Sequence, residues 1–274
     1  MLELPESDVI ASQLRERLLG RRISHVVAAA SPHRFAFYTC DPQRYPAMLE
    51  GLSLSDVHAY GGLVELEMED MRFVFGDGAT IHYLQPGVEP PAKHQLLFRL
   101  DDGSHLVWTI QMYGSLGVFK DGTNDNPYYL VAKEKPSPLT GAFTEPWFAS
   151  LVSATPSKLS VKAFLATEQR IPGLGNGTLQ DILFNARLNP RTKLATLDDA
   201  QLKQLYACTQ DTLQVMAKQG GRDTEKNLFG ESGGYRTLLS AKTFTKPCPR
   251  CGHEIIRQAY LGGNVYFCPM CQPV

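Results

Sequence analysis

The sequence lacks the features of a membrane or secreted protein. It has no apolar run long enough to span a membrane, and its first residues do not combine a basic segment with an apolar one, as a secretory signal does. Only six cysteines occur among 274 residues, and we find no internal repeat or low-complexity tract. We therefore expect a cytoplasmic protein. Its length is sufficient for two domains, each with its own hydrophobic core.

Charge is modest in amount and uneven in distribution. Asp, Glu, Lys and Arg make up 20% of the chain, and the net charge is −1. Residues 1–154 contain 12 Lys or Arg against 19 Asp or Glu, whereas residues 155–274 contain 15 against 9. A basic half suits a polyanion such as nucleic acid, because cationic side chains that neutralise phosphates release counterions. The sequence thus predicts that the C-terminal half contributes most of any phosphate contact.

Four of the six cysteines form two Cys-x-x-Cys pairs near the end of the sequence, with 16 residues between the pairs. This spacing is typical of a zinc site closed by four thiolates. Residues 255–261 and 264–267 are predicted to be short strands joined by a turn at Gly262-Gly263. Such a segment is too small to bury a core, so metal binding would supply its folding free energy. The alternative, two disulfides, has no support elsewhere in a chain without secretory features. We predict one structural Zn²⁺, held by Cys248, Cys251, Cys268 and Cys271.

Hydrophobic periodicity predicts an α+β fold with a strand-rich N-terminal domain. Residues 5–19 carry apolar side chains at helical spacing, and from residue 23 to about 130 the spacing changes to every second residue. Six or more short strands in this segment predict a β-sandwich or flattened barrel, with the first helix capping it, in residues 1–130. The helix is expected to bury Ile10, Leu14 and Leu18. The sheet is expected to turn Glu65, Glu67 and Glu69 towards solvent.

The rest of the chain is predicted to be helical. Residues 131–145 are assigned to a linker within a turn-rich stretch, residues 146–240 to a helical domain and residues 241–274 to the zinc hairpin. Thr196 and Asp199 are placed like a capping pair at the start of the longest helix. Helices are expected at residues 146–153, 160–167, 178–188 and 197–219.

A glycine-rich turn, Gly173-Leu-Gly-Asn176, joins two of these helices. Glycines let the backbone approach a ligand closely, and the start of the following helix exposes N–H groups that favour an anion. With Asn176 and Lys162 beside it, the turn is predicted to hold a phosphate group. A tight helix–helix turn without a ligand is the alternative.

The order of these features along the chain is more specific than any one of them. The sequence opens with Glu3-Leu-Pro-Glu6, continues through the strand-rich domain and the Gly-Leu-Gly-Asn turn, and ends in the four-cysteine segment followed by Gln272. It resembles the formamidopyrimidine-DNA glycosylase/endonuclease VIII family over essentially its whole length. The resemblance implies a helix–two-turn–helix motif in residues 146–240. It also implies a monomeric base-excision repair enzyme that binds damaged double-stranded DNA and flips the damaged base out of the stack.

The resemblance implies roles for individual residues. In that family the N-terminal amine attacks the sugar C1′, and a neighbouring glutamate moves protons. Leu2 takes the position of the nucleophilic residue and Glu3 that of the glutamate, so both are predicted catalytic residues. Asn176 takes the place of a phosphate-binding asparagine. Met112 and Tyr113 are predicted to fill the gap left by the flipped base, as apolar wedges do in kinked duplexes.

The sequence departs from the family pattern at several groups that contact or cleave DNA. The family's nucleophile is a proline, whereas Leu2 would carry a free amine only after removal of Met1. The stretch Tyr60-Gly-Gly62 has no lysine where the family has one, Gly263 replaces an arginine of the hairpin turn, and Asp77 brings a carboxylate near the phosphates. We therefore predict cleavage of the N-glycosidic bond, while these losses count against the subsequent AP-lyase step.

Two other functions remain open from the sequence. A non-catalytic DNA-binding protein on the same scaffold would account for the missing proline, lysine and arginine. A zinc module that contacts RNA or protein rests on the cysteine pairs alone. Glu3 and Glu6 also have a simpler alternative role, because carboxylates near the start of a helix stabilise it by roughly 0.3–1 kcal/mol.

Overall fold

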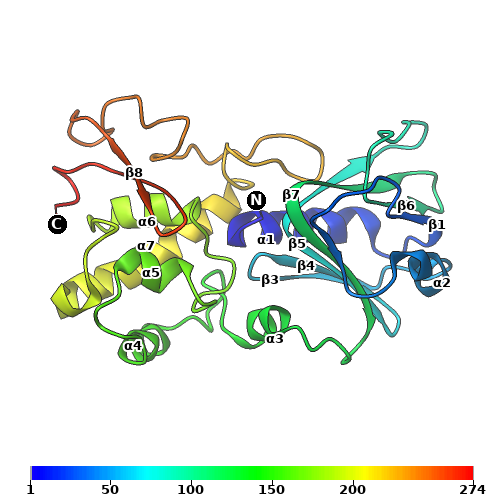
Figure 1. The fold of residues 1–274 in the computed structure, drawn as a ribbon, viewed down its shortest axis with the longest axis horizontal. Coiled ribbons are helices and arrows are strands. Elements are labelled where there is room, and N and C mark those ends of the chain that lie inside the picture. The colour runs from blue at the N-terminus through cyan, green and yellow to red at the C-terminus, as the bar shows by residue number, and fades with distance from the viewer. Residues whose placement is uncertain (1, 274) are drawn as a thin grey trace.

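The computed structural model describes residues 2–273, apart from the side chain of Asp77. A strand-rich half and a helical half lie side by side, and the C-terminal hairpin lies over the helical half (Figure 1). Among residues 2–273 there is no helix long and apolar enough to cross a membrane. The helices are α1 (Leu4–Leu18), α2 (Tyr45–Leu49), α3 (Pro127–Glu134), α4 (Glu145–Ser153), α5 (Val161–Ala166), α6 (Thr178–Asn185) and α7 (Asp199–Lys218), with short 3-10 helices at Pro42–Arg44 and Leu194–Thr196. The strands are β1 (Ile23–Ala28), β2 (Ala36–Tyr38), β3 (Asp56–Tyr60), β4 (Leu63–Met68), β5 (Met71–Leu84), β6 (Leu96–Leu100), β7 (His105–Lys120), β8 (Ile256–Tyr260) and β9 (Gly263–Phe267).

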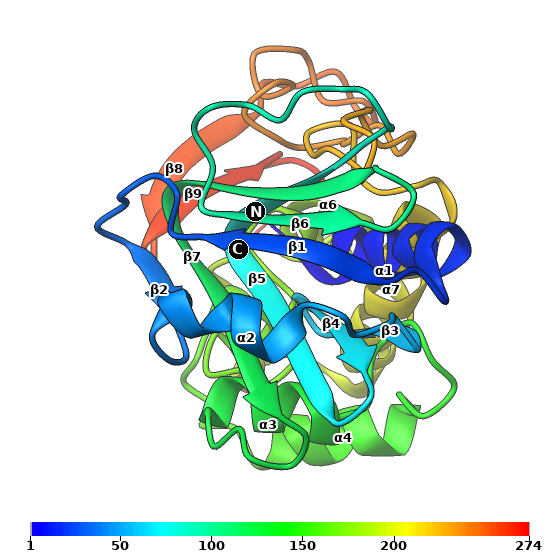
Figure 2. The same ribbon diagram turned by 90° about the vertical axis from the view of Figure 1, so that its right-hand side faces the viewer.

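Strands β1 to β7 form one hydrogen-bonded sheet that folds over on itself (Figure 2). Its order is β1-β6-β7-β5-β4-β3, and β2 pairs in parallel with β7. The long strands β5 and β7 run through both ends of the sheet, and their register shifts between Asp77 and Ala79. A Cβ on Gly78 would lie 2.0 Å from the backbone oxygen of Tyr113, so glycine is needed where the two paired strands approach closely at this bulge.

The core of the strand-rich half lies between the two ends of the folded sheet. The rings of Phe73 and Trp108 meet edge to face there, with centroids 4.9 Å apart. The same core contains side chains from β1 and β6 at one end of the sheet and from β3 and β4 at the other. It also buries the predicted stripe of α1, at Ile10, Leu14 and Leu18. The predicted sandwich with its N-terminal helix is therefore confirmed.

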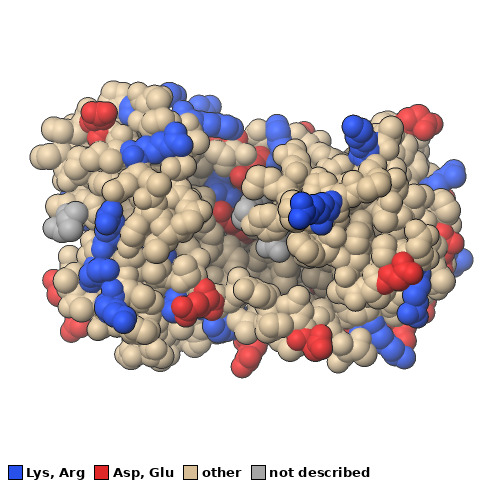
Figure 3. All heavy atoms as spheres, viewed as in Figure 1, with Lys and Arg blue, Asp and Glu red and all other residues tan. Residues whose placement is uncertain are grey.

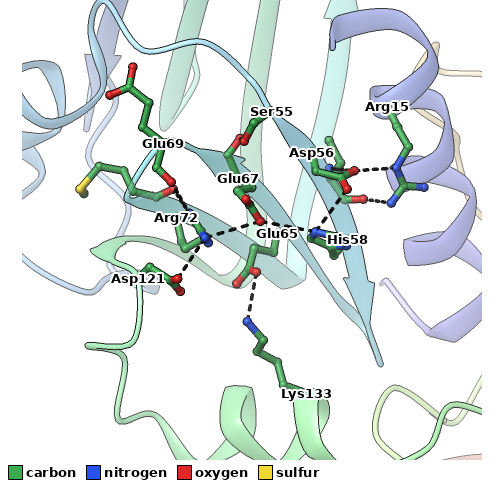
Figure 4. A network of polar contacts seen from close by, with 12 residues as sticks. Arg15, Ser55, Asp56, His58, Glu65, Glu67, Glu69, Arg72, Asp121 and Lys133 are labelled. Atoms are coloured by element: carbon green, nitrogen blue, oxygen red, sulfur yellow. Dashed lines mark hydrogen bonds and ion pairs between the residues drawn. The ribbon is translucent and has the colours of Figure 1, made fainter. Parts of the chain in front are cut away.

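The prediction of a solvated face at Glu65, Glu67 and Glu69 is wrong for Glu65, whose exposed fraction is 1%. Its carboxylate accepts a hydrogen bond from the hydroxyl of Tyr129. It also pairs with Lys133, with 3.3 Å between Nζ and Oε1 (Figure 4). Both partners belong to α3, which covers this part of the sheet. Alternation in the sequence shows that a strand has two faces, but it does not show that a distant helix covers the polar one.

Helix α3 lies in the stretch predicted to be a turn-rich linker. The side chain of Asn126 accepts a hydrogen bond from the N–H of Tyr128, and Pro127 occupies the first turn, where its missing N–H costs nothing. Tyr129 packs against Val74 and Phe119 of the sheet. The predicted boundary after residue 130 therefore falls inside a helix that is packed on the strand-rich half.

Helices α4 to α7 pack around a second core and contain the four helices that were predicted, with ends shifted by three residues or fewer. The cap of α7 differs from the prediction. Asp198 and Gln201 form the capping box, in place of Thr196 and Asp199. Helix α1 packs against α7 and thereby joins the two halves of the molecule.

The C-terminal hairpin pairs β8 with β9 in antiparallel register. Its turn lies at Leu261 and Gly262, one residue earlier than predicted, and both residues have the positive φ angles (47° and 75°) of a type I′ turn. The backbone N–H of Tyr266 on β9 donates to Oε1 of Gln180 on α6, at 3.0 Å. The hairpin is therefore fixed to the helix that follows the glycine-rich turn.

Candidate active site and metal centre

A hollow of about 500 Å³ lies between the two halves of the molecule. Leu2 and Glu3 line it from the N-terminus, Gly62 and Tyr113 from the sheet, and residues 173–176 from the helical half. Figure 3 shows the surface hollowed between the halves. The structure thus brings together four residues that were predicted from distant parts of the sequence, namely Leu2, Glu3, Tyr113 and Asn176.

Glu3 is bound to the start of α6. Its side chain is almost fully buried, and its two oxygens accept hydrogen bonds from the backbone N–H groups of Gly177 and Thr178, at 2.9 and 2.8 Å. A helix start carries partial positive charge and free N–H groups, so it favours a carboxylate at this place. A Cβ on Gly175 would lie 2.5 Å from Cδ of Glu3, which explains the need for glycine in the turn.

Arg222 connects Glu3 and Glu6, and sequence reasoning did not find it. Its guanidinium is buried, with Nη1 3.5 Å from Oε1 of Glu3, and with Nε and Nη2 donating to Oε1 and Oε2 of Glu6 at 2.9 and 2.7 Å. Burial alone would lower the pKa of Arg222, but the two carboxylates outweigh burial and raise it. The arginine follows Gly220-Gly221, and no local pattern indicates that its side chain reaches back to the N-terminus.

Asn176 lies where the glycine-rich turn meets the hairpin. Its Nδ2 donates to the backbone oxygen of Asn264 at 2.9 Å, and Nε2 of Gln180 donates to the same oxygen at 3.1 Å. A Cβ on Gly263 would lie 3.3 Å from the amide of Asn176. The position of this asparagine in the hollow therefore depends on the hairpin that packs beside it.

The structure places Lys162 and Met112 away from the hollow. Lys162 is 3% exposed, its Nζ donates to the backbone oxygen of Tyr260, and burial lowers its pKa. Here the lysine holds the hairpin rather than facing solvent. Met112 is exposed beside Tyr113. The contacts of both residues with DNA stay predictions.

Two groups that entered the sequence-based predictions lie outside the described residues. They are Met1, whose removal would be needed to free the amine of Leu2, and the side chain of Asp77.

The four paired cysteines form a cluster suited to one metal ion. The Sγ atoms of Cys248, Cys251, Cys268 and Cys271 all lie within 4.8 Å of one another. Two of the separations are 3.9 Å (Cys248 to Cys271) and 3.4 Å (Cys251 to Cys268). A tetrahedral site with Zn–S bonds of about 2.3 Å requires sulfurs about 3.8 Å apart. The sulfurs are too far apart for disulfides, so the cluster fits the predicted thiolate site and not the alternative.

The sequence is similar to known proteins over its whole length. Residues 1–143 match the formamidopyrimidine-DNA glycosylase N-terminal domain. A formamidopyrimidine-DNA glycosylase of Symbiobacterium thermophilum is 30% identical over 283 aligned positions, which cover 100% of this chain and 90% of that protein. One of Brevibacillus brevis is 27% identical and is aligned over 99% of both chains. The chain belongs to the formamidopyrimidine-DNA glycosylase family.

Solved structures of this family have the same fold. The MutM (Fpg) protein of Thermus thermophilus aligns with a TM-score of 0.81 at 26% identity, over 98% of both chains. Lactococcus lactis Fpg, in a complex with abasic-site DNA, aligns with a TM-score of 0.84 at 22% identity, over 99% of this chain and 100% of that one. The predicted fold class is confirmed. So is the class of function, that of a DNA-repair glycosylase of the formamidopyrimidine-DNA glycosylase family.

Proposed function

We propose that this protein binds damaged double-stranded DNA across the hollow and cleaves the N-glycosidic bond of a base flipped into it. The observation that supports this most directly is the position of Glu3, a buried carboxylate in a hollow lined from both halves of the molecule. Its volume of about 500 Å³ lies in the range of roughly 300–1,000 Å³ typical of ligand sites. The abasic-site DNA in the complex of Lactococcus lactis Fpg supports the same substrate class.

The proposed chemistry uses Glu3 as a fixed negative charge. Cleavage adds water across the N-glycosidic bond: the departing base takes up a proton from solvent and leaves positive charge on the sugar, and water then attacks C1′. A preorganised carboxylate stabilises that positive charge without first having to reorient. The backbone N–H groups of α6 and Arg222 hold the carboxylate in place. Leu2 lines the same hollow and is proposed to lie beside the sugar C1′.

The proposed reaction ends mainly at base release. The AP-lyase step needs an amine that forms a Schiff base with the sugar. Gly62 is in the hollow where the family pattern has a lysine nearby, and none of the described residues that line the hollow is a lysine or an arginine. Among the described residues that line the hollow no side-chain amine is present, so the amine at the chain start is the remaining candidate, and the family's proline is not there.

The remaining contacts with DNA are proposed from position and type. Asn176 faces the hollow and would bind a backbone phosphate, Tyr113 and Met112 would fill the gap in the duplex, and Lys162 would add positive charge beneath the surface. The cysteine cluster would hold one Zn²⁺, whose chemical contribution is structural. By fixing β9, the ion would also fix Asn264 and hence Asn176. The protein is proposed to act as a monomer.

The proposal is tested with a set of duplexes that each contain one oxidised purine, one oxidised pyrimidine or no lesion. Free base is quantified by mass spectrometry after incubation with the zinc-loaded protein. Release from at least one damaged duplex, and none from the undamaged one, is the expected result. A protein that is folded and zinc-loaded but releases no base from any duplex would overturn the proposal.

The second candidate is a damaged-DNA-binding protein without turnover. The observation in its favour is that both oxygens of Glu3 accept hydrogen bonds from the start of α6, with Arg222 beside them, so the carboxylate already has a structural role. This alternative predicts tight binding to abasic-analogue DNA by the native protein with no product from any lesion. Product that disappears in Glu3→Gln excludes it.

A further inference from the structure

A second hollow adjoins the one beside Glu3. Its volume is about 350 Å³, and it lies between β2, the C-terminal part of β7 and the start of α3. Leu63 and Tyr128 line both hollows, so these two side chains form the partition between them. Two sites that share a wall can be occupied by neighbouring units of one polymer.

The walls of the second hollow are aromatic. Phe37 on β2 is 56% exposed and Tyr128 on α3 is 63% exposed, although large apolar rings are normally buried. Phe119 and Tyr129 form part of the floor, where their rings meet edge to face at 5.3 Å. Phe37 pairs with Ser115 of β7 in parallel register, and this pairing fixes the ring of Phe37 at the rim of the second hollow.

The polar groups of this hollow suit a neutral ring with hydrogen-bonding edges. Asn124 and Asn126 line it, and their Oδ1 atoms accept hydrogen bonds from the backbone N–H groups of Asn126 and Tyr128, respectively. The side-chain NH2 groups of Asn124 and Asn126 are then left as donors to a ligand. The cation beside the floor, Lys133, donates to the hydroxyl of Tyr129 at 2.9 Å and is paired with Glu65, while Asp121 and Asp125 follow β7 in the sequence. These features favour a nucleobase over a phosphate.

We propose that this second hollow is a subsite for an unpaired nucleobase next to the lesion, stacked between Phe37 and Tyr128. Base–aromatic stacking tolerates any base, because every base has a flat face. The subsite would be filled only when the neighbouring base has left the duplex stack. The protein should then bind a lesion inside an unpaired bubble more tightly than the same lesion in a continuous duplex. This inference rests on the proposed binding of damaged DNA at the first hollow.

The test compares two probes that carry the same abasic analogue (tetrahydrofuran), one in a full duplex and one in a small bubble. Dissociation constants are measured at one salt concentration for the native protein and for Phe37→Ala. We expect the native protein to prefer the bubble, and Phe37→Ala to weaken bubble binding by about five- to 100-fold, with little change on the duplex. Phe37 is used because it lines only the second hollow.

Two variants serve as controls. Phe37→Trp should restore the preference for the bubble, because it presents a larger stacking surface. Phe229→Ala removes a ring of similar exposure that packs on Tyr83, and it should bind both probes as the native protein does. 2-Aminopurine placed beside the analogue should lose fluorescence on binding to the native protein, and should lose less with Phe37→Ala.

The outcomes separate this inference from the proposed function. Native protein that binds the duplex probe but shows no preference for the bubble, or Phe37→Ala that binds both probes unchanged, overturns the second subsite alone. An equal loss on both probes also overturns it, because Phe37 would then contact paired DNA. Failure of the native protein to bind either probe overturns the proposed function together with the subsite.

Discussion

The guanidinium of Arg222 forms two hydrogen bonds with the carboxylate of Glu6, one from Nε at 2.9 Å and one from Nη2 at 2.7 Å. Both side chains are almost fully buried. The pair joins α1 to the loop after α7, and Nη1 of the same guanidinium lies 3.5 Å from Glu3. A structural ion pair therefore adjoins the candidate catalytic carboxylate, and the two can be separated by mutation.

Glu6→Gln should destabilise the fold strongly. Arg222 would lose both charge-assisted hydrogen bonds to Glu6 and keep only its longer contacts with Glu3 and Glu225, so the cost should approach the roughly 3–5 kcal/mol of breaking a buried ion pair. Urea unfolding followed by circular dichroism measures this change in the free energy of unfolding. The control is Asp70→Asn, which breaks the exposed pair with Lys120 and should cost less than about 1 kcal/mol. Equal effects of the two substitutions would contradict the role of Arg222 as a structural anchor.

Glu3→Gln should lower the rate of base release by at least about 100-fold, because a neutral amide does not stabilise positive charge on the sugar. Binding to abasic-analogue duplex should change by less than about fivefold. Single-turnover kinetics and fluorescence anisotropy measure the two effects separately. Asp8→Asn, on the exposed side of the same helix, is the matched control and should leave both unchanged. Full base release by Glu3→Gln would remove the carboxylate from the mechanism.

Cys248→Ser should abolish stoichiometric zinc binding and weaken DNA binding, while the remainder of the chain stays folded. The physical reason is that β8 and β9 bury little on their own, and that Asn264 on β9 positions Asn176. Elemental analysis and anisotropy with abasic-analogue duplex check both effects. Cys40→Ser changes a thiol outside the cluster and should retain one zinc per chain. Loss of zinc without loss of DNA binding would show that the hairpin does not position the DNA-binding site.

The stability of the protein should depend on pH through Asp181. Burial raises the pKa of this carboxyl to about 6, although Leu238, Leu239 and Tyr235 donate hydrogen bonds to it. The folded state holds the proton of Asp181 more tightly than the unfolded state does. Protonated Asp181 therefore adds to the free energy of unfolding, and this contribution is fully present below about pH 4. It is lost as the pH rises through about 6, at a cost of about 3 kcal/mol.

Urea unfolding at pH 4.5 and pH 6.5 measures this dependence. The free energy of unfolding of Asp181→Asn at pH 6.5, relative to pH 4.5, should be higher than that of the native protein by more than half of about 3 kcal/mol. The exposed Asp211→Asn, on α7, should reproduce the native difference. An unchanged difference in Asp181→Asn would show that Asp181 does not titrate in this range.

Local patterns in the sequence predict the parts of the structure that local chemistry determines. The stripe of Ile10, Leu14 and Leu18 follows from helical spacing, and the cysteine cluster follows from two Cys-x-x-Cys pairs. The meeting of Leu2, Glu3, Tyr113 and Asn176 in one hollow could be anticipated only through the resemblance to a family, because these residues lie far apart in the sequence.

The parts that sequence reasoning missed depend on contacts between distant segments. Glu65 has the sequence pattern of a solvated residue because its partners, Tyr129 and Lys133, lie on a helix that was itself assigned to a linker. Arg222 has no visible role in the sequence because its partners are at the other end of the chain. The place of Lys162 near the turn predicts a phosphate ligand, whereas its burial against Tyr260 is evident only once the hairpin is in place.

The most direct test of the central claim uses a set of duplexes that each contain one oxidised base, incubated with the protein and then analysed with and without hot alkali. Alkali cleaves the strand wherever a base has been removed, whereas a lyase cleaves it beforehand. We predict cleavage that appears mainly after alkali and is lost in Glu3→Gln. A strand that stays intact after alkali, with folded and zinc-loaded protein in excess over every lesion tested, would contradict the account.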